Sequence, residues 1–142
     1  MKFPNTQQLH SFALVNPEQL FNPRPFAFSH VAEVRHYLRA LHISGQGGQN
    51  QQGQLSSDFV HQVEQAFRNI TFILKDRDAT LADIAVLRIY VVEHNSKKHQ
   101  LLIQAMQRLW QDRAFPACTL VPVNCLALTG MLIEVEATAY CL

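Results

Sequence analysis

Apolar and polar residues alternate with a helical period in the middle of the chain. Between Asp58 and Lys75 the apolar side chains recur at intervals of three and four positions, which predicts a helix with one continuous apolar stripe. Ser57 stands directly before this segment, and we expect it to cap the first turn. A second helix is predicted from Ser96 to about Asp112, because similar spacing is present there and Pro116 lies just past its end.

Strands are predicted on both sides of these helices. The segment Ile84–Val92 is β-branched and almost continuously apolar, as expected of a central strand. Further candidate strands are residues 9–15, 28–34, 37–44, 117–126 and 131–142. The strands at 28–34 and 37–44 lie close enough in sequence to pair as a hairpin.

The order of these elements predicts an α+β fold with a mixed six-stranded sheet and two helices packed on one face. With 142 residues the chain is long enough to bury a hydrophobic core without disulfide or metal staples. We therefore expect a single domain over residues 1–142, which begins with an irregular, proline-containing arm at residues 1–27.

Alternation along the last predicted strand separates its residues onto two faces. Glu134, Glu136 and Tyr140 fall on the face opposite the helices, where alternation in the central strand also places Arg88 and Tyr90. Such a face is too apolar for open water and too polar for an internal core, so it suits a subunit interface with a polar pocket. Two simpler interpretations remain open: both glutamates are solvated, or Glu134 forms a structural ion pair with Arg88.

The charge content adds a second argument for association. Charged residues make up 16% of the chain, against about 25% in a typical soluble domain. Residues 40–57 contain no Lys, Arg, Asp or Glu, and residues 114–142 contain only Glu134 and Glu136. Charge-poor stretches of this length favour burial against other subunits.

Composition also excludes several classes of function. A net charge of +1 supplies no basic surface for nucleic acid or an anionic membrane. No apolar segment resembles a signal peptide or is long enough to span a bilayer, so we expect a cytoplasmic protein. The three cysteines lack CxxC spacing and the seven histidines lack HxH or HExxH spacing, so neither a disulfide framework nor a metal site is expected.

Several segments of the chain resemble the signature of the Rid family, also called the YjgF or L-PSP endoribonuclease family. They are FSH at residues 28–30, ISGQ at 43–46, QAFRNI at 65–70, the central strand at 83–91, FPACTLVPV at 115–123, and LIEVEA at 132–137. These segments occur in the family's order, and the resemblance covers roughly residues 28–139.

The resemblance implies a homotrimer in which three sheets close a barrel-like core, with small-molecule pockets between adjacent subunits. Members with deaminase activity hydrolyse reactive imines or enamines to a 2-keto acid and ammonia, and they need no metal or cofactor. In those members an arginine after Pro-Ala holds the substrate carboxylate, and the first glutamate of the last strand helps to position the attacking water. A Ser-Gly segment and a tyrosine complete the pocket.

Carried over to this sequence, the resemblance makes Glu134 the candidate catalytic residue and makes Ser44 and Gly45 candidate ligand-binding residues. The arginine position holds Cys118, and the tyrosine position holds Phe28. A guanidinium gives a carboxylate two charge-assisted hydrogen bonds, each on the order of 1.5–3 kcal/mol, which a thiol cannot replace. We therefore expect the pocket to persist with an altered ligand.

Two further candidate residues need a role. Arg88 is the cation that we place on the mixed face, where it could anchor an anion or neutralise a neighbouring glutamate. Cys118 is expected to be a small packing residue rather than a nucleophile, because no Cys/His pairing can be read from the sequence. The glycine-rich stretch from Gly45 lacks GxGxxG spacing and an adjoining helix, so it is not expected to bind phosphate.

Two hypotheses for the function follow. The first is a homotrimer that binds, or acts on, a small metabolite other than the usual 2-imino acid. The second is a cofactor-independent imine or enamine deaminase, a hydrolase in which Glu134 positions water and another residue replaces the arginine. Ribonuclease activity, which the family's older name suggests, is not favoured because the neutral charge balance offers no surface for phosphates.

Overall fold

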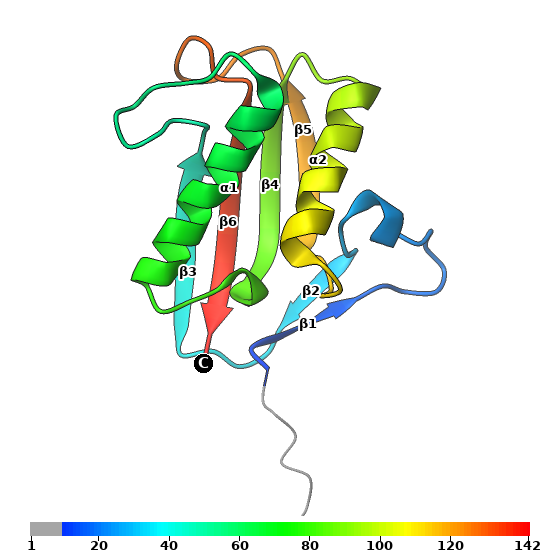
Figure 1. Cartoon of the computed structure of the whole chain (residues 1–142). Coiled ribbons are helices and arrows are strands. Elements are labelled where there is room, and N and C mark those ends of the chain that lie inside the picture. Colours follow the sequence, from blue (N-terminus) through cyan, green and yellow to red (C-terminus); the bar gives the residue numbers. More distant parts are fainter. Residues whose placement is uncertain (1–9) are drawn as a thin grey trace, which may run out of the picture.

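The computed structural model describes residues 10–142 (Figure 1). Within that range the chain forms six strands, two α-helices and two short 3-10 helices. In chain order they are β1 (Phe12–Val15), η1 (Arg24–Phe26), β2 (Val31–Val34), β3 (Arg39–Gln46), α1 (Phe59–Asp76), η2 (Leu81–Asp83), β4 (Ile84–Val92), α2 (Ser96–Trp110), β5 (Ala117–Val123) and β6 (Ile133–Cys141). The first nine residues of the expected N-terminal arm lie outside the described residues, and so does Leu9 of its expected strand.

The larger sheet has the strand order β3-β6-β4-β5, in which β4 and β5 are parallel and the other neighbours are antiparallel. β1 and β2 form a separate antiparallel pair. A parallel bridge between Ser29 and Ala117 links the chain just before β2 to the β5 edge. The α+β class and the mixed strand directions are confirmed, but the six strands are divided between a four-stranded and a two-stranded sheet.

The expected hairpin between residues 28–34 and 37–44 is wrong. β2 pairs with β1, and β3 pairs with β6. The connecting residues form bonds to distant segments rather than a tight turn: the backbone N–H of Arg35 donates to the Ser11 carbonyl at 2.9 Å, and that of Leu38 donates to the Cys141 carbonyl at 2.9 Å. The chain therefore passes from one sheet to the other at this point.

Helix α1 begins one residue later than its sequence pattern suggests. Asp58, and not Ser57, is the N-cap, and its carboxylate accepts hydrogen bonds from the backbone N–H groups of Val60 at 2.7 Å and His61 at 3.3 Å. A carboxylate at this position also interacts favourably with the partial positive charge of the helix N-terminus.

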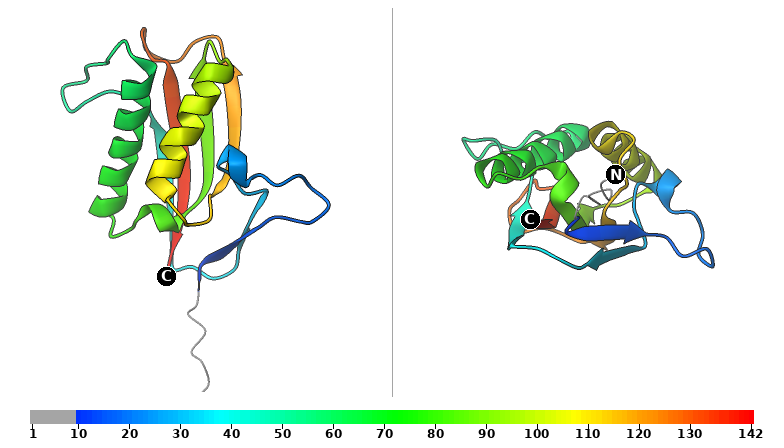
Figure 2. Two further views of the ribbon diagram at one scale, coloured as in Figure 1. Left: turned by 45° about the vertical axis from the view of Figure 1, so that its right-hand side comes forward. Right: turned by 90° about the horizontal axis from the view of Figure 1, so that it is seen from below.

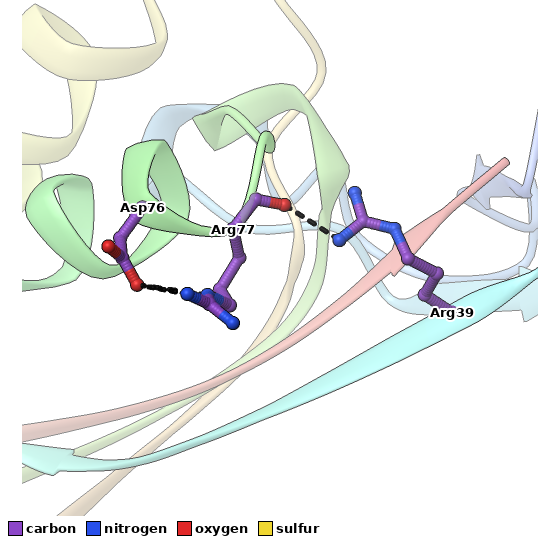
Figure 3. Close-up of polar contacts among 3 residues, drawn as sticks. All are labelled: Arg39, Asp76 and Arg77. Carbon is purple, nitrogen blue, oxygen red and sulfur yellow. Dashed lines mark hydrogen bonds and ion pairs between the residues drawn. The ribbon is translucent and has the colours of Figure 1, made fainter.

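The C-terminal end of α1 is fastened to the sheet by Arg39 of β3 (Figure 3). The Arg39 guanidinium donates to the carbonyl oxygens of Arg77 at 2.7 Å and Asp78 at 3.3 Å. Carbonyls at a helix C-terminus lack partners within the helix and carry partial negative charge, so a cation is favourable there. The side chain of Arg77 points away and pairs with Asp76 at 2.7 Å, in a pair that is well exposed.

Both α-helices lie side by side on one face of the larger sheet (Figures 1 and 2). The core lies between them and the sheet, where alternate residues of β6 from Ile133 to Cys141 are buried, as the strand alternation predicts. Phe67 of α1 meets Trp110 of α2 edge-to-face at 6.2 Å between ring centroids. Within residues 10–142 the opposite face of the sheet has no helix over it (Figure 2, right).

Candidate functional site

Glu134 lies against Gly45 on neighbouring strands. β3 departs from regular pairing with β6 between Ile43 and Gln46, so Ser44 and Gly45 form an irregular segment beside the start of β6. A Cβ atom on Gly45 would lie 2.7 Å from Cδ of Glu134, which is closer than side chains tolerate. The absence of a side chain at Gly45 therefore allows the Glu134 carboxyl group to rest on the β3 backbone.

Arg88 is paired with Glu136 rather than with Glu134. The two residues are Cα partners on β4 and β6, and Arg88 Nη1 lies 3.6 Å from Glu136 Oε1. The Tyr90 hydroxyl donates to the other oxygen of Glu136 at 3.2 Å. Desolvation and the Glu136 carboxylate raise the pKa of Tyr90, which keeps the phenol protonated as the donor. Arg88 thus neutralises a glutamate on this face, in a half-exposed pair that contributes little to stability.

Cys118 and Phe28 line a different space. They face a cavity of about 320 Å³ that is bounded by α2, β5 and residues 26–28. Burial raises the pKa of the Cys118 thiol to about 12. A thiol with such a pKa is almost entirely protonated at neutral pH, which makes it a poor nucleophile.

The strand register separates these two groups of residues. Cys118 is the partner of Leu87, which is buried beneath the helices, whereas Thr119 is the partner of Arg88. Because paired residues share a face, Cys118 belongs to the helix-covered side of the sheet and Arg88 to the open side.

Glu134 is also on the open side, since it is the partner of Tyr90. One chain therefore brings Glu134 to Gly45 and Cys118 to Phe28, but it does not bring the two pairs together.

Gln62 is a structurally important residue of this region that the sequence analysis missed. It is fully buried, and its amide donates to the carbonyls of Ser56 at 2.7 Å and Gly130 at 2.8 Å and accepts from the Leu132 N–H at 2.8 Å. A Cβ atom on Gly48 would lie 2.6 Å from the Gln62 Cα, so the glycine-rich loop packs directly on the helix here. The sequence does place Gln62 on the apolar stripe of a predicted helix. A buried polar residue there needs hydrogen-bond partners inside the protein, and this position could have revealed its role.

The glycine- and glutamine-rich loop is also held by Asn69 of α1. Its side-chain amide donates to the carbonyls of Gly47 at 3.1 Å and Gln49 at 2.8 Å. Gln65 donates to the Asn69 side-chain oxygen at 2.9 Å and so fixes the orientation of that amide. One face of α1 thus holds the loop that follows Gly45.

The residues of the structure from 10 to 142 include no group of three or more His, Cys, Asp or Glu side chains placed to hold a metal ion. In the same range, neither helix combines the length and the apolar character that crossing a membrane requires.

Comparison with known proteins identifies the family. The model of the family described as "Endoribonuclease L-PSP" matches residues 24–141. The crystal structure of YyfB from Yersinia pestis, described as a member of the conserved Rid protein family, is 35% identical over 94% of this chain and 100% of that chain, with a TM-score of 0.87. YyfA from the same organism is 26% identical over 71% of this chain and 79% of that chain, with a TM-score of 0.65.

A more distant structure shares the fold alone. RidA from an Antarctic Psychrobacter is 23% identical over 78% of this chain and 87% of that chain, with a TM-score of 0.66. No curated protein matches the chain. The family match covers most of the sequence, and the similarity to YyfB extends along nearly all of it. The chain therefore belongs to the Rid family, the family of L-PSP endoribonuclease-like proteins.

Proposed function

We propose that this chain forms a homotrimer with small-molecule pockets between adjacent subunits, and that its ligand is a small metabolite other than a 2-imino acid. The observation that carries the proposal is the division of the candidate site between the two faces of one sheet. A pocket that contains both Cys118 and Glu134 requires residues from two subunits, because the sheet separates them within one chain.

The character of the open sheet face supports association. The β6 residues on this face, among them Glu134, Glu136 and Tyr140, are all only partly exposed. Large apolar side chains are exposed near one end of the sheet, where Leu38 is 85% and Tyr37 51% accessible to solvent. A face that mixes polar and apolar groups in this way resembles a protein interface more than a free surface.

The side chain at position 118 is the reason to expect a ligand other than a 2-imino acid. The arginine that deaminase members use to hold a carboxylate is replaced by a neutral thiol, and Arg88 is held by Glu136 on the other face of the sheet. The loss of two charge-assisted hydrogen bonds, each on the order of 1.5–3 kcal/mol, should weaken the binding of a 2-imino acid anion by a factor of at least about a hundred.

A deaminase is the second candidate, favoured by the position of Glu134. Its carboxyl group rests on the Gly45 backbone and forms no ion pair within residues 10–142, since Arg88 is paired with Glu136. In this hypothesis Glu134 positions the water that attacks the imine carbon, and the ammonia leaves as the 2-keto acid forms.

A coupled assay separates the two candidates. A dehydratase generates 2-aminoacrylate, and release of the keto acid is compared with spontaneous hydrolysis. The proposed function predicts no acceleration by the wild-type protein. Acceleration that is abolished by Glu134→Gln and retained by Glu136→Gln would establish the deaminase instead. Sedimentation equilibrium tests the assembly, and a monomer at micromolar concentration would contradict the trimer.

A further inference from the structure

The cavity beside Cys118 is large enough to hold a ligand within a single subunit. Its volume of about 320 Å³ is at the lower end of the range for small-molecule pockets, roughly 300–1,000 Å³. The ring of Phe28 and the side chains of Leu102, Ile103 and Met106 from α2 supply much of its wall. These groups favour a ligand whose body is flat or aliphatic rather than highly hydrated.

The wall carries no charged carboxylate, ammonium or guanidinium group among the described residues. Cys118 is a neutral thiol because burial raises its pKa to about 12. Thr119 also borders the cavity, but its register with Arg88 assigns its side chain to the opposite face of the sheet. An anion that entered this space would lose its hydration and find no ammonium or guanidinium group in the wall, which is unfavourable.

His99 is the side chain at the wall that is best suited to form a hydrogen bond with a ligand. Its ring stacks on Phe26 at 6.3 Å between centroids and with an interplanar angle of 17°. The ring of His94 meets it from another direction at 5.6 Å. Burial and the nearby His99 and Lys98 lower the pKa of His94, which favours the neutral form of the His94 ring. Two aromatic contacts therefore fix the orientation of the His99 ring.

We propose that this cavity binds an uncharged small molecule with an apolar, ring-like body and one hydrogen-bonding group, which His99 contacts. Cys118 gives this selectivity, because arginine at the same position would both fill part of the cavity and attract anions. This proposal rests on the proposed function, because the cavity would form one side of the inter-subunit pocket. All the wall residues named above belong to one subunit.

Two probes that share one ring system test the proposal. Isothermal titration calorimetry at neutral pH compares 2-naphthol, which is uncharged, with 2-naphthoate, which carries a carboxylate in place of the hydroxyl. We expect 2-naphthol to bind at least tenfold more tightly to the wild-type protein. Failure to detect 2-naphthol binding, or binding of 2-naphthoate that is equal or tighter, would overturn the proposal without reference to any variant.

Three variants test whether the probe binds in this cavity. Cys118→Arg should reverse the preference between the probes. Cys125→Arg makes the same change at an exposed cysteine that does not line the cavity, and it should leave the preference unaltered. His99→Phe should weaken 2-naphthol binding by roughly three- to tenfold, the value of one net hydrogen bond, and should leave the binding of naphthalene within twofold. An unchanged 2-naphthol affinity in both His99→Phe and Cys118→Arg would place the probe elsewhere and overturn the assignment.

Sedimentation of the same samples distinguishes this proposal from the proposed trimer. A monomer that prefers 2-naphthol would contradict the trimer and support the neutral-ligand cavity. A trimer that does not bind 2-naphthol would support the assembly and overturn the cavity's ligand class.

Discussion

At the scale of single residues, the identity of residue 118 determines the chemistry of the cavity. A partly buried thiol with a pKa of about 12 neither attracts an anion nor attacks an electrophile at neutral pH. Compared with an arginine at this position, cysteine carries no positive charge and supplies no reactive group at neutral pH. The rate at which Cys118 reacts with thiol reagents reports on its surroundings, because these reagents react with the thiolate.

Iodoacetamide should therefore distinguish Cys118 from Cys125. At pH 8 a thiol with a pKa of about 12 is ionised in about one molecule in ten thousand, whereas Cys125 is exposed. We expect peptide mass spectrometry to find Cys125 carbamidomethylated within minutes and Cys118 unmodified. In urea-denatured protein both residues should react. Comparable rates for the two cysteines in the folded protein would show that Cys118 is not in the apolar environment described.

At the scale of secondary-structure elements, α1 organises the segments on both sides of the site. Through Gln62 it holds the residues just before β6, and through Asn69 it holds the loop that follows Gly45. Both attachments are hydrogen bonds between uncharged side-chain amides and backbone groups, and the Gln62 amide is fully buried. The removal of such a partner leaves backbone groups desolvated and unpaired.

The Gln62→Leu variant should be markedly destabilised. The change keeps the approximate size of the side chain but removes the partners of two carbonyls and one N–H group, so we expect the free energy of unfolding to fall by about 3 kcal/mol or more. Gln65→Leu is the matched control, because this residue lies one turn away and bonds only the side chain of Asn69 among the described residues. Urea denaturation measures both, and equal losses would contradict a special role for Gln62.

The same elements show what the sequence could and could not reveal. The bounds of β4 were predicted correctly because this segment is β-branched and almost continuously apolar, and the buried face of β6 followed from strict alternation. The false hairpin arose because the partners of residues 35–38 lie far away in sequence, at Ser11 and Cys141. Alternation also could not place Cys118 relative to Arg88, since that depends on the register between two parallel strands.

At the scale of the whole molecule, the open sheet face is the surface that the proposed trimer would bury. Figure 2 shows both helices on the other side, so association through this face leaves them at the outside of the assembly. Three polar groups of the face already have partners within the chain, because Glu136 contacts Arg88 and Tyr90. They can therefore be buried at a lower cost than unpaired charges.

A charge introduced into this face should dissociate the trimer. Thr138 is half-buried on the open side of β6, as the partner of Val86, and Thr138→Lys would place three unpaired ammonium groups in the enclosed core. We expect sedimentation velocity to show monomers at concentrations where the wild type is trimeric. Thr71→Lys makes the same substitution at an exposed position on α1 and should leave the trimer intact. Dissociation by both variants, or by neither, would argue against the proposed interface.

Because the sheet divides the site, ligand selection and the position of the carboxylate can change independently. The side chains proposed to select a ligand, around residue 118, project from one face, while the carboxylate proposed to act on it, Glu134, projects from the other. A substitution at the edge strand can thus change what the protein recognises without disturbing the packing around the carboxylate. In a protein built this way, a single substitution at position 118 is expected to alter ligand selection while the strand that carries Glu134 keeps its place in the sheet.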